Sequence, residues 1–344
     1  MKFGPVRVSK ALGGIVAHAV RRDGLVLKKG EIITEARIAA LKAHGVAEIV
    51  VAQLEPGDIA EDAAAGMLAE AIAGANLRAE TPFTGRSNLY AEKSGVLLLD
   101  ADELDRINDI DERVTIATLP PNRAVVAGEM VATVKIIPFA VPGQIIARAG
   151  ELAPGARLRI APYRPARVGV ISTVLPGLKP SVIAKTLRVL EDRLAPAGAG
   201  VAMELRVEHK SADLAAAIPR VAAECDLIVI FGASAITDRR DVIPAAIEAA
   251  GGTIEQFGMP VDPGNLLLLG SVAVGNRRKT ILGAPGCARS PKENGFDWVL
   301  QRLLADVPVT ASDIRKMGAG GLLMEIISRG QRRAGDSLST AEQE

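Results

Sequence analysis

Aromatic residues and cysteines are scarce in this sequence of 344 residues. It contains six Phe, two Tyr and one Trp, so its hydrophobic cores must be built from Val, Ile, Leu and Ala. The two cysteines, Cys225 and Cys287, lie far apart and form no CxxC pair, which argues against a disulfide framework and against a zinc knuckle. This composition favours α/β layers and fits a reducing cytoplasm.

An excess of charge of one sign is absent as well. Forty-one Lys and Arg stand against forty Asp and Glu, a net charge of +1, so the chain as a whole has no field that would attract nucleic acid or an anionic membrane. No window approaches the roughly 18 uninterrupted apolar residues of a membrane span, and MKFGPVRVSKALGG at the N-terminus lacks the apolar stretch of a signal peptide. We therefore expect a cytoplasmic protein that binds neither nucleic acid nor membrane and whose anion sites are local.

The length exceeds the size at which a single hydrophobic core stops growing, which predicts more than one domain. Proline and arginine cluster in LAPGARLRIAPYRPAR, so we place a boundary near 155–166. The expected division is an N-terminal mixed α/β region over 1–160 and a second domain over 161–330. A disordered tail is expected over 331–344, because QRRAGDSLSTAEQE is polar and has no face for a core.

The N-terminal region mixes helices and strands. TEARIAALKAHGVAEIVVA predicts a helix capped by Thr34 and stopped by Gly45, followed by a strand. EDAAAGMLAEAIAGANL predicts another helix, whereas GEMVATVKIIPFAVPG and GELAPGARLRIAPY are typical of β segments separated by Gly and Pro.

The second half alternates short apolar runs with helical stretches. Strands are expected at RVGVIST, VAMELRVEH, DLIVIFGA, TIEQFGMPV, LLLLGSVAV and KTILGAPG. Helices are expected after a Ser181 cap, over SADLAAAIPRVAAE with a kink or a break at Pro219, over IPAAIEAAGG, and finally over ENGFDWVLQRLLA. This alternation predicts a doubly wound, mainly parallel sheet covered on both faces, whose ligands gather beyond the C-terminal strand ends.

Three stretches join an apolar strand to Gly, Pro and small polar residues: FGASAITDRRD, MPVDPGNLLLLG and LGAPGCARSPKENG. In a parallel sheet these turns share one edge and can form the wall of one pocket. Glycines there let backbone N–H groups approach a ligand closely, and N–H groups at a following helix N-terminus bind phosphate or another anion. A negatively charged, extended ligand is expected.

Each of these residues also has a purely structural interpretation. Gly232 and Gly264 can be ordinary turn glycines, and residues 238–241 can be a solvated loop with internal ion pairs. Ser290 can cap a helix that starts at Pro291, and Cys287 can be a small buried hydrophobe.

Histidine offers little catalytic signal. The spacing of the three His residues indicates no shared metal, and no GxSxG sequence is present. His209, at the end of an expected strand, is a candidate pocket residue.

Residues 167–305 resemble the molybdopterin-binding domain shared by molybdopterin adenylyltransferases and molybdenum insertases. FGAS resembles the Gly-Gly-x-Ser/Gly turn of that family with Phe231 in place of the first glycine, and RRDV is followed by Pro244 as in the adenylyltransferases. Two later turns, PGN and PGCARS, resemble the insertases' Pro-Gly turns, with Cys287 where the family commonly has Asn. ISTVLPG resembles the first strand and its turn, and KKGEIITEARIAALKAHGVAEIVVA resembles an insertase segment.

The resemblance implies a site for a pterin that carries a dithiolene and a terminal phosphate. It implies catalytic roles for Asp241 and Asp238, with Asp241 binding Mg²⁺ or molybdate-linked water, since hard cations prefer carboxylate oxygens. The implied cofactor-binding residues are Thr173, Gly232, Ala233, Ser234, Pro263, Gly264, Asn265, Pro285, Gly286, Cys287, Arg289, Ser290 and Lys292.

The implied function is to bind molybdopterin or its molybdenum form in molybdenum-cofactor biosynthesis, maturation or delivery. Metal insertion or nucleotide attachment, as in the molybdenumtransferases and adenylyltransferases, is one version, and a carrier without turnover is the other. The chain is most similar to bacterial molybdopterin-binding proteins that are sometimes fused to a cytidylyltransferase, so a cytidylyltransferase or a molybdoenzyme is the implied partner. An unrelated nucleotide or sugar-phosphate binder stays open because fold does not fix function, and exposed sheet edges leave a homo-oligomer open.

Overall fold

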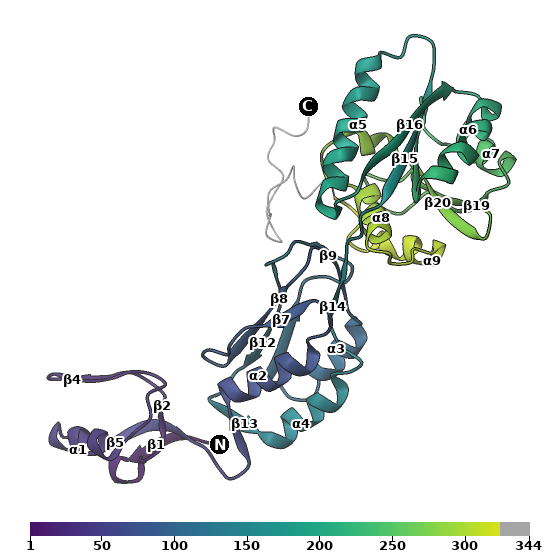
Figure 1. Ribbon diagram of the computed structural model, residues 1–344. Coiled ribbons are helices and arrows are strands. Elements are labelled where there is room, and N and C mark those ends of the chain that lie inside the picture. Colours follow the sequence, from purple (N-terminus) through teal and green to yellow (C-terminus); the bar gives the residue numbers. More distant parts are fainter. Residues whose placement is uncertain (324–344) are drawn as a thin grey trace, which may run out of the picture. The chain divides into compact units, whose positions relative to one another are not determined.

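The computed structural model describes residues 1–323 and divides into two compact units, Met1–Ala161 and a second that begins at Pro162 (Figure 1). The tail expected over 331–344 lies outside the described residues. Each of the four hydrophobic core clusters lies within one of the two units. Within residues 1–323, no helix is both long and apolar enough to cross a membrane.

The first 53 residues build a small antiparallel sheet with one helix. The elements are β1 (Lys2–Arg7), β2 (Ile15–Val16), β3 (Val20–Arg22), β4 (Leu25–Leu27), α1 (Glu35–Ala43) and β5 (Glu48–Gln53). β5 pairs with β1 and β2, and β3 pairs with β4 as a separate hairpin. The Thr34 hydroxyl accepts a hydrogen bond from the Arg37 N–H, and Gly45 takes a left-handed conformation, which confirms both predicted ends of α1.

The rest of the first unit surrounds α2 with short sheets. Its elements are β6 (Asp58–Ala60), α2 (Glu61–Ile72), β7 (Leu77–Ala79), β8 (Arg86–Ala91), β9 (Gly95–Leu98), α3 (Ala101–Asn108), β10 (Val114–Thr118), β11 (Ala124–Val125), β12 (Met130–Ile136), β13 (Ala140–Pro142), α4 (Gly143–Leu152) and β14 (Arg159–Pro162). The prediction of β structure throughout GELAPGARLRIAPY is wrong in its first part, because α4 continues to Leu152 and only β14 is a strand.

The second unit alternates strands and helices as the sequence predicts. Its elements are β15 (Arg167–Val174), α5 (Pro180–Leu194), β16 (Gly200–Glu208), α6 (Ser211–Glu224), β17 (Leu227–Phe231), α7 (Val242–Ala249), β18 (Thr253–Phe257), β19 (Leu268–Val274), β20 (Arg277–Ala284), α8 (Gly295–Leu304) and α9 (Ala311–Arg315), with short 3-10 turns between some of them.

These strands form one six-stranded sheet in the order β16-β15-β17-β20-β19-β18. The four neighbouring strands β16, β15, β17 and β20 run parallel to one another, so the sheet is mostly parallel. β19 runs antiparallel to both of its neighbours because a tight turn at Gly275 connects it directly to β20. The start of β19 therefore lies at the same edge as the ends of β17, β18 and β20.

Helices cover both faces of this sheet. On one face, side chains of α5 and α8 such as Leu190 and Phe296 pack with Val229 of β17. On the other face, side chains of α6 and α7 such as Ile218 pack with Ile230 of the same strand. Neighbouring residues of a strand point to opposite faces, so β17 is buried on both sides and is apolar throughout.

Several predicted helix ends are wrong. α5 begins at Pro180, because proline is suited to a first helical position, and Ser181 lies inside the helix instead of capping it. α8 begins after Asn294, whose side chain forms a capping box with α8, so Ser290 caps no α-helix. Pro219 lies within the single helix α6, and α9 follows α8, which is thus not the last helix.

Candidate functional site

The three predicted turns leave the sheet at one edge, the C-terminal ends of the parallel strands, which we call the rim. Phe231 at the end of β17 pairs with Ala284 at the end of β20. Leu268, the first residue of β19, pairs with Gly283 of β20 and with Phe257 at the end of β18. The turns at 232–241, 258–267 and 285–294 therefore follow one another along the rim.

The first turn is tight and is anchored to β15. A Cβ atom on Gly232 would lie 2.6 Å from the Ser234 carbonyl oxygen and 3.0 Å from Ile243, so only glycine fits without a shift. The Ala233 N–H donates to the Thr173 hydroxyl at 2.8 Å, and Thr173 is buried at the end of β15. Sequence reasoning selected Gly232, Ala233 and Thr173, and the structure brings them together.

His209 also lies at this turn. The ring Nδ1 of His209 is 2.8 Å from the Thr173 hydroxyl oxygen, and the backbone N–H of His209 donates to the Val174 carbonyl. The Thr173 oxygen therefore joins the ends of β15 and β16 to the turn after β17. The sequence reasoning named His209 as a candidate pocket residue only because it ends a predicted strand.

The two candidate catalytic carboxylates have partners within the chain. Asp241 caps α7, and its side chain accepts hydrogen bonds from the Thr237 N–H, the Thr237 hydroxyl and the Val242 N–H. The Thr237 N–H is the main reason that the pKa of Asp241 lies below its usual range. Asp238 forms an exposed ion pair with Arg240, 2.8 Å between Oδ1 and Nε. Residues 1–323 contain no group of three His, Cys, Asp or Glu side chains arranged to hold a metal ion.

Arg289 links the third turn to the first. Its guanidinium donates to the Gly232 carbonyl at 2.8 Å and to the Thr186 hydroxyl of α5 at 3.0 Å. It also lies 5.4 Å from the centroid of the Phe231 ring. The Phe231 ring thus packs against the guanidinium of Arg289, and burial lowers the pKa of Arg289.

Arg193 of α5 binds the backbone of the third turn through hydrogen bonds, and sequence reasoning missed it. Its side chain is 9% exposed and pairs with Asp297. It donates to the carbonyl oxygens of Ala288, at 3.0 Å, and Ser290, at 2.7 Å. The only sequence feature that could have indicated its role is the position of Arg193 beside Leu190 and Leu194 on the apolar side of an amphipathic helix.

The second turn packs against the start of α8. The Asp262–Pro263 peptide bond is cis. A Cβ atom on Gly264 would lie 2.9 Å from the Cα and N atoms of Gly295, whose N–H donates to the Pro263 carbonyl at 2.8 Å. Asn294, beside Gly295, donates to the Cys287 carbonyl of the third turn at 3.3 Å. The three turns are thus connected by hydrogen bonds.

The cysteine of the third turn is not set up as a nucleophile. Cys287 is a free, half-buried thiol. Burial raises the pKa of this thiol, so little thiolate is present near neutral pH. Pro285 is buried, whereas Gly286 is exposed and a Cβ atom there would meet no atom within 4 Å.

Exposed polar groups occur along all of these turns. Lys179 follows β15, Arg239 lies in the first turn and Lys292 in the third. These three cations are exposed and form no ion pair within residues 1–323. Ser234 is exposed in the first turn, and the second turn exposes Asn265. This combination of free cations, hydroxyl and amide groups suits an anionic ligand.

The second unit is a doubly wound α/β domain, a class of fold whose ligands lie beyond the C-terminal strand ends, where this domain has its glycine turns and free cations. Residues 170–306 match a family model described as a probable molybdopterin binding domain. This match confirms the resemblance found in the sequence, so residues 170–306 of the second unit form a domain of the probable molybdopterin-binding type. Residues 5–53 match a model described as a domain of unknown function.

Solved structures similar to the chain include the molybdopterin biosynthesis moeA protein from Pyrococcus horikoshii, with 17% identity over 89% of this chain and 75% of that one and a TM-score of 0.31. A molybdenum cofactor biosynthesis protein from Pyrococcus furiosus has 12% identity over 89% of this chain and 64% of that one, with a TM-score of 0.26. TM-scores this low do not establish a common arrangement of whole chains. No curated protein matches the sequence significantly.

Proposed function

We propose that the rim of the second unit binds molybdopterin or its molybdenum form and that the chain takes part in maturation or delivery of the molybdenum cofactor. The observation that carries this proposal is the joining of the three turns, through the Arg289 side chain and the Gly295 N–H, in a domain that matches the molybdopterin-binding family. Three segments far apart in sequence thus contribute to one continuous surface.

The available donors fit the terminal phosphate of the pterin. Lys179, Arg239 and Lys292 are exposed cations, and Ser234 offers a hydroxyl group next to the glycine turn. Charge-assisted hydrogen bonds from such groups are about twice as strong as neutral ones. In this proposal Arg289 is a positioning residue, because its guanidinium is already bonded to Gly232 and Thr186.

The geometry favours a carrier over an enzyme. Both carboxylate oxygens of Asp241 accept hydrogen bonds from the chain, and Asp238 is neutralised by Arg240. The Asp241 carboxylate already accepts three hydrogen bonds from the chain, which leaves it about one lone pair to hold Mg²⁺ for metal insertion or nucleotide attachment. A carrier performs neither metal insertion nor nucleotide attachment, and it would transfer the bound cofactor to a cytidylyltransferase or a molybdoenzyme. Free cysteines in the described structure fit a cytoplasmic site of action.

Binding is tested by titrating molybdopterin and following pterin fluorescence. The double variant Lys179→Gln/Lys292→Gln removes two rim cations, and Lys185→Gln/Arg188→Gln removes two exposed cations from the middle of α5. We expect the Kd to rise on the order of tenfold or more for the rim variant, as for loss of charged hydrogen bonds, and to stay near wild type for the control. Equal effects of both variants, or no binding by the wild type, would contradict the proposal.

Turnover is tested separately by adding molybdate, Mg²⁺ and nucleotide to the complex. A carrier binds the pterin and forms no product. Product formation that is lost in Asp241→Ala would instead establish the enzymatic version.

A further inference from the structure

Residues 1–53 concentrate a positive charge that the whole chain does not show. They contain nine Lys and Arg against four Asp and Glu, a net charge of +5, whereas residues 54–344 contain 32 against 36. The segment has its own hydrophobic core around Leu27, Leu41 and Val51. A local field that attracts anions is therefore built on a separate core at this end of the chain.

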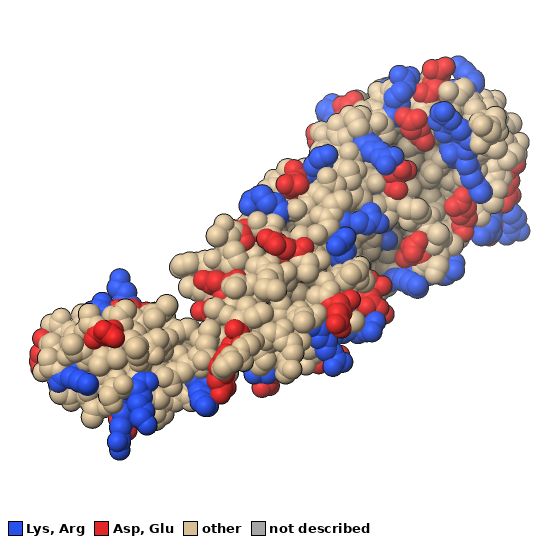
Figure 2. Space-filling model, turned by 60° about the horizontal axis from the view of Figure 1, so that its bottom comes forward, with Lys and Arg blue, Asp and Glu red and all other residues tan. Residues whose placement is uncertain are grey.

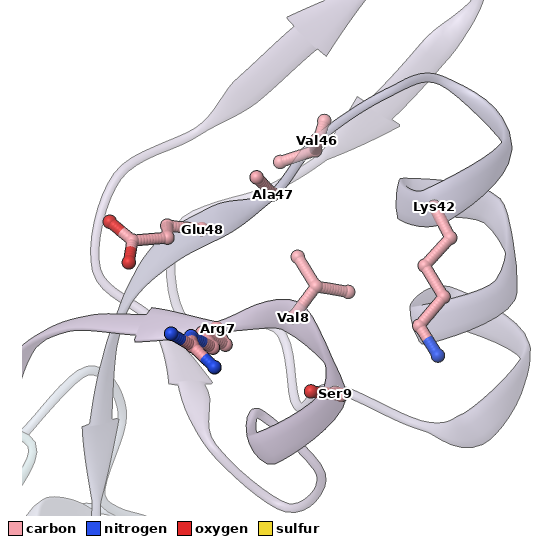
Figure 3. Close-up of a pocket in the computed structure, with 7 residues that line it drawn as sticks. All are labelled: Arg7, Val8, Ser9, Lys42, Val46, Ala47 and Glu48. Atoms are coloured by element: carbon pink, nitrogen blue, oxygen red, sulfur yellow. The ribbon is translucent and has the colours of Figure 1, made fainter.

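Part of this charge surrounds a hollow of about 510 Å³ between α1 and the start of β5 (Figure 3). Val8, which is 2% exposed, and Val46 form an apolar floor. Arg7, at the end of β1, lies on one side of Val8, and Lys42, in the last turn of α1, lies on the other (Figure 3). The Ser9 hydroxyl lines the same hollow.

The two cations are free to bind a ligand. Glu48 also lines the hollow and lies opposite Arg7 in the register of β1 and β5, yet within residues 1–323 neither Arg7 nor Lys42 forms an ion pair with it or with any other residue. Both side chains are exposed. By contrast, Arg37 on the same helix as Lys42 is bound to Glu31 at 2.6 Å.

The chemistry of the hollow favours a carboxylate on a peptide over a nucleic acid. A guanidinium fork matches a carboxylate, and the valine floor matches the apolar part of a peptide. Proteins that bind single-stranded nucleic acid commonly stack its bases on several aromatic side chains, whereas Phe3 is the only aromatic residue of this segment.

We propose that this Arg7–Lys42 hollow binds an acidic peptide segment of a partner protein, with one carboxylate between the two cations. The proposal goes beyond the cofactor function and does not depend on it, because the hollow and the rim belong to different units of the chain. A docking surface for an acidic partner gives the N-terminal segment a role of its own.

The test measures fluorescence anisotropy of a fluorescein-labelled hexaglutamate peptide with the full-length protein at low salt. Arg7→Gln/Lys42→Gln removes the two cations of the hollow. Arg21→Gln/Arg22→Gln removes two exposed cations from β3 of the same segment and changes the net charge equally. We expect the Kd to rise on the order of tenfold for the first pair and less than about threefold for the second, since exposed charges away from the contact are screened.

Three results would overturn the proposal. Equal losses for both pairs would mean that only diffuse charge attracts the peptide. Competition by inorganic phosphate as effective as that by unlabelled hexaglutamate would define a small-anion site, and tighter binding of a hexadeoxynucleotide would define a nucleic-acid surface. Thermal melts of all variants check that the exposed substitutions leave the fold intact.

Discussion

Replacing Arg193 by Met should destabilise the second unit strongly, because this one side chain holds the whole third turn. Its guanidinium is nearly buried and satisfies Asp297 together with the carbonyl oxygens of Ala288 and Ser290. Removing one partner of a buried ion pair costs about 3–5 kcal/mol, since the remaining charge stays unpaired. We therefore expect the free energy of unfolding of this unit to fall by about that amount.

The assay is urea unfolding followed by fluorescence of Trp298, the one tryptophan of the chain, which lies in α8. With a slope of about 1–3 kcal/mol per M urea, the midpoint should fall by roughly 1 M or more. Arg188→Met is the matched control, because Arg188 is exposed on the same helix and should change stability by less than about 0.5 kcal/mol. If the free energy of unfolding of Arg193→Met lies within about 1 kcal/mol of the wild-type value, Arg193 does not stabilise the third turn as described.

Three further predictions concern the rim and use the same unfolding assay. Gly264→Ala should lower the free energy of unfolding by about 1–3 kcal/mol, because its Cβ atom would lie 2.9 Å from backbone atoms of Gly295. Gly286→Ala should leave it nearly unchanged, because a Cβ atom there meets no other atom, and equal effects of the two variants would contradict the packing described for the second turn. Thr173→Val leaves the half-buried Ala233 N–H without its acceptor, so it should lower the free energy of unfolding by about 1 kcal/mol and weaken pterin binding; unchanged pterin binding would show that this bond does not support the site. Asp241→Ala should cost about 1 kcal/mol at neutral pH through loss of the cap of α7. The pKa of Asp241 is lowered in the folded state, so its contribution to stability is fully present above the unfolded pKa near 3.9 and disappears as the pH falls through the lower folded pKa. If the difference in unfolding free energy between wild type and Asp241→Ala grows on acidification, this role of the carboxylate is refuted.

The sequence predicted the strands and helices of the second unit well, because the apolar runs of β15 and β17 are buried on both faces and have few alternatives. Helix ends were predicted less well. Ser290 and Asn294 are both good caps, and only the capping box with Asp297 decides between them. The direction of β19 also escaped prediction, since a parallel crossover and a tight hairpin can follow the same apolar run.

The turns of the site were found from glycine and proline, but the bonds that join them were not. Arg289 was selected as a ligand donor, and its bonds to Gly232 and Thr186 depend on contacts across more than fifty residues of sequence. The bonds of Arg193 likewise span about a hundred residues of sequence. Local sequence carries propensity and pattern, whereas these bonds arise from tertiary packing.

Charge shows the same limitation at the scale of the chain. The net charge of +1 conceals the basic first 53 residues, and Figure 2 shows Lys, Arg, Asp and Glu side chains interspersed on one face of the molecule. Counting charge by structural segment reveals the basic segment on which the Arg7–Lys42 hollow lies, which the total does not.

Binding of molybdopterin at the rim can be measured by amide hydrogen exchange with and without the ligand. We expect the ligand to slow exchange in residues 232–241 and 285–292 of the rim. Slowed exchange confined to residues 1–161, or no change at the rim under saturating molybdopterin, would contradict it.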